Sequence, residues 1–203
     1  MVDGRRITDA KMLEVVTMVY GGLVNKSLVA RLQACGINAL GLTGADMNAV
    51  QSHKRPLKNS IDFGFVGDVD HVNGYALQLL LQQGITPVMA PLTHDGQGNI
   101  LNTNADTMAS EMAKALSRFF NVTLIYCFEK PGVLRNPADE TSLIPVITRE
   151  EFSGYVADGT VSGGMIPKLE NALAAVDHGV SKVIITLATA IDGKHGTVIQ
   201  RRK

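Results

Sequence analysis

Two asparagines and an aspartate stand on alternate residues in the segment 102–106, which reads N-T-N-A-D. The segment enters a helix that apolar spacing predicts over residues 105–119. An Asn side chain both donates and accepts hydrogen bonds, so this cluster could bind a polar organic ligand. Capping of the helix explains the same residue types on its own, because Asn and Asp are favoured at helix starts. Both interpretations stay open on these residues alone.

A glycine pair, Gly163-Gly164, precedes a second predicted helix over residues 165–178, and Lys168 stands one turn into it. Paired glycines let the main chain come close to a ligand, and free amides at a helix start attract anions. Lys168 would add a point charge beside a bound phosphate. The alternative is an ordinary loop with a solvated lysine. The chain contains neither G-x-x-x-x-G-K-S/T nor G-x-G-x-x-G, so no P-loop or Rossmann phosphate site is indicated.

A third segment, 128–134, directly follows a predicted buried strand and could hold a nucleotide or merely turn the chain.

The sequence gives less support to other kinds of catalytic site than to these three segments. The five histidines show no paired metal spacing, and no serine lies in a G-x-S-x-G context. We therefore expect neither a dedicated zinc site nor a covalent nucleophile.

The elements that must position these segments alternate along the chain. Further helices are predicted at 8–34, where Thr8 or Asp9 is the cap, at 73–83, and after the capping box at 148–151. Strands are predicted at 37–42, 86–90, 122–127, 181–187 and 196–200, with a hairpin over 54–69. This order predicts an α/β fold with a largely parallel sheet, covered on both faces. Gly21-Gly22 in the first helix indicates either a bend or close packing against a second subunit.

Composition narrows the class. The chain has 203 residues, 45% of them hydrophobic, and 19 basic against 19 acidic side chains, which argues against a nucleic-acid binder. The consecutive apolar runs are too short to span a bilayer, and no secretory signal is evident. Cys35 and Cys127 both lie in apolar segments, so we expect two reduced thiols in the core of a cytoplasmic protein.

Three segments taken together resemble the acetylglutamate kinases: N-T-N-A-D at 102–106, G-G-M-I-P-K at 163–168 and G-R-R-I-T-D at 4–9. They occur in that family's order. The resemblance implies the amino-acid-kinase fold, a three-layer α/β/α sandwich with a mainly parallel central sheet. It implies a single domain over 1–203, with the acylglutamate-binding lobe at 1–110 and the nucleotide-binding lobe at 111–203. It also implies a homodimer or a ring of dimers.

The implied reaction moves the γ-phosphate of ATP to the γ-carboxylate of an N-acyl-L-glutamate, the second step of arginine biosynthesis. Mg²⁺ would arrive with the nucleotide, and neither a metal site of the protein's own nor a nucleic-acid or membrane partner is implied. By the resemblance, Asp106 orients the catalytic cations and Lys168 stabilises the transferring phosphoryl group. The substrate would contact Arg6, Asn102 and Asn104, and the nucleotide would contact Glu129, Lys130, Pro131, Gly132, Val133, Leu134, Thr160, Val161 and Ser162.

The chain also departs from the family. Members usually begin with a K-x-G-G strand and an H-G-G-G loop, and neither motif is present, so we expect an N-terminally incomplete kinase. A non-catalytic fragment that binds N-acylglutamate or pairs with a complete subunit is one alternative. Another kinase of the same fold, for carbamate, aspartate or glutamate, is a second. Arg5 replaces the usual Leu, as a surface residue or as a partner for an extra carboxylate such as that of a succinyl group. Glu129 replaces the usual Asp.

Overall fold

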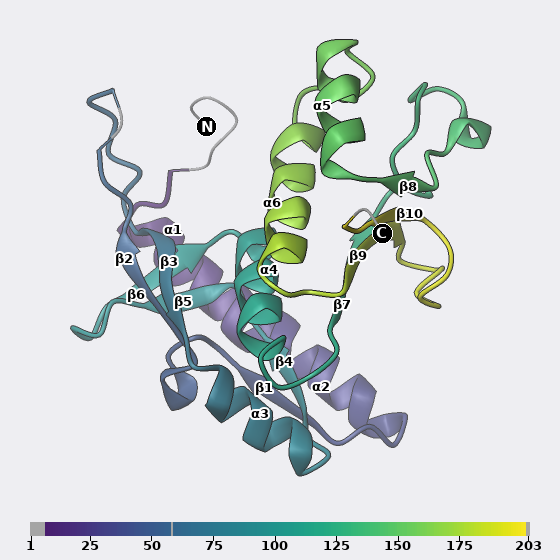
Figure 1. The fold of residues 1–203 in the computed structure, drawn as a ribbon. Coiled ribbons are helices and arrows are strands. Elements are labelled where there is room, and N and C mark those ends of the chain that lie inside the picture. The colour runs from purple at the N-terminus through teal and green to yellow at the C-terminus, as the bar shows by residue number, and fades with distance from the viewer. Residues whose placement is uncertain (1–6, 58, 202–203) are drawn as a thin grey trace. The chain divides into compact units, whose positions relative to one another are not determined.

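The computed structural model describes residues 7–57 and 59–201, and the segments 1–6, 58 and 202–203 lie outside the described residues. The chain divides into two units, residues 1–108 and 109–203 (Figure 1). The boundary falls inside helix α4 (Ala105–Leu116). That these units are a substrate lobe and a nucleotide lobe stays a prediction.

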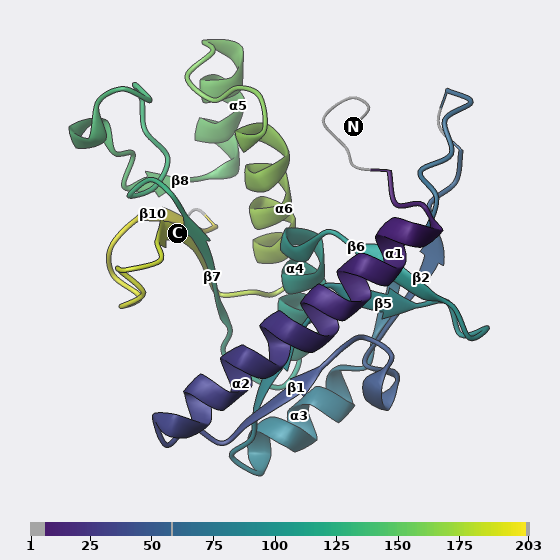
Figure 2. The same cartoon turned by 180° about the vertical axis from the view of Figure 1, so that it is seen from behind.

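The first unit begins with one long helix, made of α1 (Ala10–Val16), the π-helical segment η1 (Thr17–Val24) and α2 (Asn25–Ala34) (Figure 2). Asp9 caps it, because its Oδ1 accepts the N–H of Met12 at 2.8 Å. The predicted helix and the second of its two candidate caps are therefore confirmed. Gly21 lies in the π-helical segment, and a Cβ there would be 3.2 Å from the Leu92 side chain. This glycine thus permits close packing within the unit itself.

Two short strands, β1 (Ala39–Leu42) and β4 (Thr86–Met89), pair in parallel beneath this helix. The side chain of Asn25 fastens the helix to them, since Nδ2 donates to the carbonyl oxygen of Val88 at 2.8 Å. Helix α3 (Gly74–Gln82) precedes β4 and lies within its predicted range of 73–83, and Asn73 is its cap. The short 3-10 turn η2 (Asp46–Asn48) follows β1.

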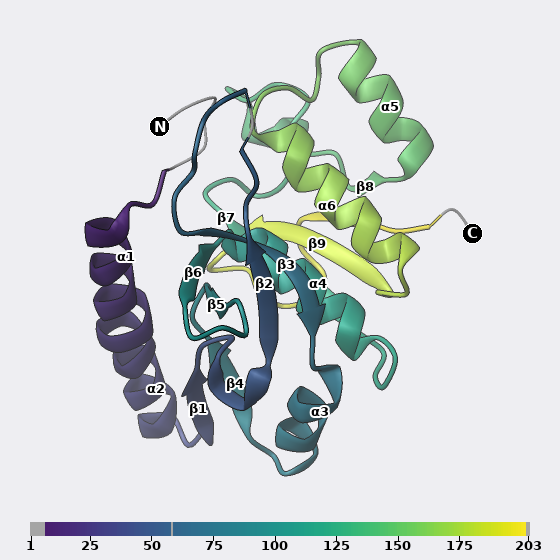
Figure 3. The same ribbon diagram turned by 90° about the vertical axis from the view of Figure 1, so that its left-hand side faces the viewer.

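A closed barrel forms the other half of the first unit (Figure 3). Its strands are β2 (Val50–Lys54), β3 (Val66–Val72), β6 (Ile100–Thr103) and β5 (Leu92–His94), in that order around the barrel. The predicted hairpin is real, but its strands only partly overlap the expected range of 54–69, because β2 ends at Lys54 and β3 continues to Val72.

The second unit is built on a four-stranded sheet in the order β7 (Thr123–Phe128), β9 (Lys182–Leu187), β10 (Thr197–Ile199) and β8 (Val146–Ile147). The β7–β9 and β10–β8 pairs are parallel, and β9–β10 is antiparallel. Helix α6 (Met165–Asp177) packs on the sheet through buried Leu169, Ala172 and Leu173. Helix α5 (Arg149–Ala157) starts at the predicted capping box, and η3 (Glu140–Ser142) lies in the preceding loop.

Two expectations about apolar segments were wrong in detail. Cys35 and Cys127 are free and exposed, and neither belongs to the core. Strand alternation explains the second, because Tyr126 is buried and the next side chain points to the opposite face. Cys35 directly follows the last turn of α2, where the chain leaves the helix.

By length and composition alone, the long helix over Ala10–Ala34 could cross a membrane. The search for unbroken apolar runs in the sequence did not find it. Length and composition alone do not separate such a helix from one that packs on a folded unit. Here Val16 is buried and Asn25 bonds to β4, so one face of the helix belongs to the first unit. Another face of the helix exposes large apolar side chains, including Met18 and Leu23.

Candidate active site

Asn102 lies in β6 of the first unit, where one hydrogen bond holds its side-chain amide and another holds its main chain. Its Nδ2 donates to Thr8 Oγ1 at 3.0 Å, and its main-chain N–H donates to the carbonyl oxygen of Phe65 at 2.8 Å. The side chain is half-buried. A half-buried, oriented amide with one oxygen that has no partner among the described residues is suited to bind a polar ligand.

Asn104 and Asp106 continue the motif into helix α4, but with different neighbours. Asn104 is exposed, and its Oδ1 accepts the N–H of Thr107 at 2.9 Å and faces Thr107 Oγ1 at 3.2 Å. Asn104 therefore caps α4, as the alternative interpretation of these residues expected. Asp106 stands in the first turn, where the positive end of the helix dipole favours its carboxylate.

The substrate-binding prediction for Arg5 and Arg6 falls on residues outside the described part of the chain. Both arginines therefore remain predictions. The expected convergence of Asn102 and Asp106 with Lys168 of the second unit also stays a prediction.

In the second unit, the predicted nucleotide loop at 129–134 directly follows β7. Val133 and Leu134 are buried, and both polar main-chain groups of Val133 are engaged within the unit, because its carbonyl oxygen accepts the N–H of Ile144 at 2.8 Å and its N–H donates to Thr197. Lys130 Nζ pairs with Glu140 Oε1 at 3.4 Å, a partly exposed ion pair of small energetic value. This ion pair therefore contributes little to the conformation of the loop.

Thr197, a residue that the sequence did not suggest, fixes that backbone. Its Oγ1 accepts the N–H of Val133 at 2.8 Å and donates to the carbonyl oxygen of Ile144 at 2.7 Å. The hydroxyl is fully buried, and a Cβ on Gly132 would lie only 2.6 Å from it. Its partners are 64 and 53 residues away, so no local pattern could reveal the contact.

The segment 160–162 lies between α5 and α6 and is held by α5. Val161 is buried, and its N–H donates to the carbonyl oxygen of Tyr155 at 2.8 Å. The N–H of Thr160 donates to Asp158 Oδ1 at 2.9 Å, and this bond is the main reason why the pKa of Asp158 is lowered. Ser162 is exposed. Within this segment, the side chain of Ser162 is therefore the most accessible to a nucleotide.

The glycine pair at 163–164 has the open main chain that phosphate binding requires. Gly163 has φ +56, a left-handed conformation that favours glycine. Apart from the adjoining residues, no atom of the described part of the chain lies within 4 Å of where a Cβ would stand on Gly163 or Gly164. Helix α6 begins here without a side-chain cap, so its first amides are not covered by a capping side chain.

Lys168 stands one turn into α6 and is half-buried. Its Nζ lies 5.0 Å from the centre of the Tyr126 ring and 5.6 Å from that of Phe128. Both distances fall within the range of cation–π attraction. The two aromatic rings of β7 thus help to hold this ammonium near the start of α6.

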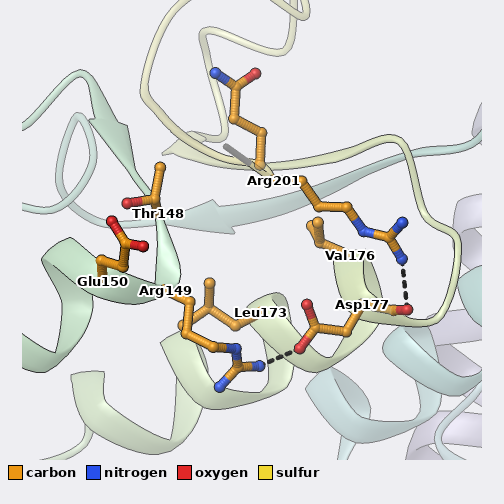
Figure 4. Close-up of a pocket in the computed structure, with 8 residues that line it drawn as sticks. Thr148, Arg149, Glu150, Leu173, Val176, Asp177 and Arg201 are labelled. Carbon is orange, nitrogen blue, oxygen red and sulfur yellow. Dashed lines mark hydrogen bonds and ion pairs between the residues drawn. The ribbon is translucent and has the colours of Figure 1, made fainter. Parts of the chain in front are cut away.

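A surface pocket of the second unit contains none of the predicted site residues (Figure 4). It lies at the end of α6, whereas Lys168 lies near the start of that helix. Arg149 forms an ion pair with the Asp177 carboxylate, and Arg201 donates to the Asp177 carbonyl oxygen at 2.6 Å (Figure 4). These exposed contacts join α5, α6 and the chain after β10. Within the described residues, no three His, Cys, Asp or Glu side chains form a metal-binding group.

Comparison with known proteins agrees with these features. The model of the amino acid kinase family matches residues 2–187. The chain belongs to this family. An acetylglutamate kinase of Phocaeicola vulgatus is 66% identical over 201 residues, which are 99% of this chain and 78% of that protein. The predicted family and the predicted class of enzyme, a phosphotransferase with a carboxyl group as acceptor, are thereby confirmed.

Solved structures confirm the α/β amino-acid-kinase fold. A Streptococcus mutans protein superposes with a TM-score of 0.81 at 29% identity, covering 98% of this chain and 76% of that one. The N-acetylglutamate synthase of Neisseria gonorrhoeae reaches 0.85 at 20% identity, covering all of this chain and 47% of that one. The second likeness concerns the fold alone. As a member of a kinase family, this amino acid kinase takes ATP as its co-substrate.

Proposed function

We propose that this amino acid kinase transfers the γ-phosphate of ATP to the γ-carboxylate of N-acetyl-L-glutamate, as in the second step of arginine biosynthesis. One observation carries the proposal: an open diglycine main chain with Lys168 one turn into α6, in a chain 66% identical to an acetylglutamate kinase. The Asn102 amide in the first unit supports the choice of a polar acceptor.

This phosphoryl transfer needs no covalent intermediate with the protein. A carboxylate nucleophile is already deprotonated at neutral pH, so no general base is needed. Alignment and neutralisation of charge at the phosphoryl oxygens supply the catalysis. Lys168 and the amides at the start of α6 contribute positive charge there, and Asp106 orients the cationic groups. The ATP phosphates would carry Mg²⁺, which would add further positive charge at the phosphoryl oxygens.

The test is a substrate panel with ATP and the purified full chain. ADP release and trapping of the acyl phosphate with hydroxylamine would be measured for N-acetyl-L-glutamate, L-glutamate, L-aspartate and carbamate. Turnover with N-acetyl-L-glutamate alone is expected. A preference for another acceptor would identify a different kinase of this fold. Calorimetric binding of N-acetyl-L-glutamate without turnover would instead identify a non-catalytic binding protein.

We propose that Arg5 determines which acyl group the enzyme prefers on its substrate. A second guanidinium beside Arg6 would pair with the extra carboxylate of N-succinyl-L-glutamate. Arg5→Leu should then lower kcat/KM for the succinyl substrate and leave the acetyl substrate unchanged. An equal ratio of the two substrates in both proteins would leave Arg5 as a surface residue.

We further propose that the protein works as a cytoplasmic homodimer, joined along the helix over Ala10–Ala34. Large apolar side chains lie exposed on that helix, including Met18 at 64% and Leu23 at 68%, with Met12, Val15, Val24 and Leu28. An exposed apolar surface of this kind marks an interface.

Light scattering coupled to size exclusion would test the dimer. Met18→Glu and Leu23→Glu should give monomers, because each would bury an unpaired carboxylate in the interface. The exposed Leu57→Glu in the same unit is the matched control. Co-sedimentation of the wild-type chain with vesicles of neutral and anionic lipid, without dimers in solution, would favour a membrane partner instead.

A further inference from the structure

Thr8 joins two distant segments of the first unit through its main chain. Its N–H donates to the carbonyl oxygen of Phe63 at 3.0 Å, and its own carbonyl oxygen accepts the N–H of Phe65 at 2.7 Å. The residue is completely buried. The segment that follows Arg6 in the sequence is therefore held against the connection between β2 and β3.

The Thr8 side chain brings in a third segment, strand β6. Its Oγ1 accepts a hydrogen bond from Asn102 Nδ2 at 3.0 Å, across 94 residues of sequence. Phe65 completes the junction, because its carbonyl oxygen accepts the main-chain N–H of Asn102 at 2.8 Å. Four hydrogen bonds thus connect Thr8, the 63–65 segment and Asn102.

Gly64 shows that this close approach is required. Its φ of +70 favours glycine, and a Cβ there would overlap the carbonyl oxygen of Thr8. Any side chain at this position would push the two segments apart. Main-chain contacts therefore hold the backbone of the junction without the Thr8 hydroxyl. The contact of that hydroxyl within the junction is its hydrogen bond with Asn102.

We propose that Thr8 is a positioning residue for substrate binding, which acts by fixing the side-chain amide of Asn102. The proposal rests on the proposed function, in which Asn102 binds the acylamino part of the substrate. With Nδ2 engaged by Thr8, the Asn102 Oδ1 atom is left without a partner among the described residues. An amide oxygen accepts hydrogen bonds, so it fits the N–H of a secondary amide.

Two variants separate the hydroxyl from the shape of the residue. Thr8→Val keeps the branched shape and the main-chain bonds but removes the acceptor for Asn102, whereas Thr8→Ser keeps it. Loss of one hydrogen bond should raise the KM for N-acetyl-L-glutamate by roughly threefold to tenfold in Thr8→Val. The KM for ATP and kcat should change little, and Thr8→Ser should restore the wild-type KM.

Thr93→Val is the matched control, because Thr93 is a buried threonine of the same barrel, and its hydroxyl pairs with Thr103 at 2.8 Å. It should not raise the KM for N-acetyl-L-glutamate selectively. Equal increases in Thr8→Val and Thr93→Val, or an increase for both substrates, would reduce the role of Thr8 to stability and overturn the proposal.

NMR of the Asn102 side-chain amide distinguishes this inference from the proposed function. Thr8→Val should shift the Nδ2 proton resonances and speed their exchange with water. Unchanged resonances would overturn the inference, whatever the activity. If the resonances change but calorimetry shows that the wild type binds no N-acetyl-L-glutamate, the proposed function fails, and the substrate role of Thr8 is overturned with it.

Discussion

The Nζ atom of Lys168, near the start of α6, lies 5.0 Å from the centre of the Tyr126 ring in strand β7. The ring of Phe128, two residues further along the strand, lies 5.6 Å from the same atom. Side chains two residues apart point to the same face of a strand, so β7 presents both rings together. Regular strand geometry thus restrains the lysine that we assign to phosphoryl transfer.

Lys168→Met should lower kcat by about 10²-fold to 10³-fold, since it removes a preorganised positive charge from the transferring phosphoryl group. Lys168→Arg should recover only part of the loss, because a planar guanidinium does not replace a compact ammonium. ADP release with N-acetyl-L-glutamate is the measurement, and the exposed Lys194→Met is the control. A kcat of Lys168→Met within about twofold of the wild type would contradict the assigned role.

Phe128→Leu tests the ring itself. Leu keeps an apolar side chain but removes the π face, and a cation–π contact of this kind contributes about 0.5–1 kcal/mol. We expect kcat to fall roughly twofold to fivefold, and Phe128→Tyr to stay near the wild type. Equal rates for the Leu and Tyr variants would mean that the ring face has no part in positioning Lys168.

Thr197→Val should weaken nucleotide binding, because it releases the N–H of Val133 and the carbonyl oxygen of Ile144 from their shared hydroxyl. The KM for ATP should rise severalfold and the free energy of unfolding should fall by about 1–3 kcal/mol. Thr186→Val, at a buried threonine of the same sheet with only a long 3.5 Å bond, is the control. An unchanged KM for ATP alongside lower stability would confine Thr197 to folding.

The role of Asn104, as a helix cap or as a substrate contact, can be determined by comparing two variants. Asn104→Ala removes the cap of α4 and should cost about 1 kcal/mol in chemical denaturation, while Asn104→Asp keeps the acceptor for Thr107. If capping is the whole role, Asn104→Asp keeps the wild-type KM for N-acetyl-L-glutamate. A clear rise in that KM with unchanged stability would support the substrate contact that the family resemblance implies.

Asp192 provides a prediction about pH. The main-chain N–H groups of His195 and Lys194 each donate to Asp192 Oδ1 at 2.9 Å and hold the pKa of this carboxyl well below its usual value. A pKa lowered by folding stabilises the protein above the unfolded pKa, and this stabilisation is lost as the pH falls through the folded pKa. Carboxyl NMR titration should show the low pKa. In Asp192→Asn, acid should cause correspondingly less destabilisation.

Local sequence was sufficient wherever the deciding contacts are short in range. Asp9 and Thr148 each cap the helix that follows them, as residue type and position predicted. The G-G-M-I-P-K segment likewise predicted an open helix start, because the glycine pair and the helix that it precedes are neighbours in the sequence. Burial in short strands was less accessible, and Cys127 was misplaced because strand pairing, rather than apolar composition, decides which face is covered.

The amino-acid sequence by itself determined the family, the α/β order of elements and the residue types that chemistry requires, because motifs and helix caps depend on neighbours along the chain. Only the tertiary structure decided which residues hold those groups in place. Thr8 stands in a family motif and Thr197 in none that the sequence revealed, yet the hydroxyls of both bond to partners between 53 and 94 residues away, which neither position indicates. Such contacts exist only after folding has closed the intervening chain.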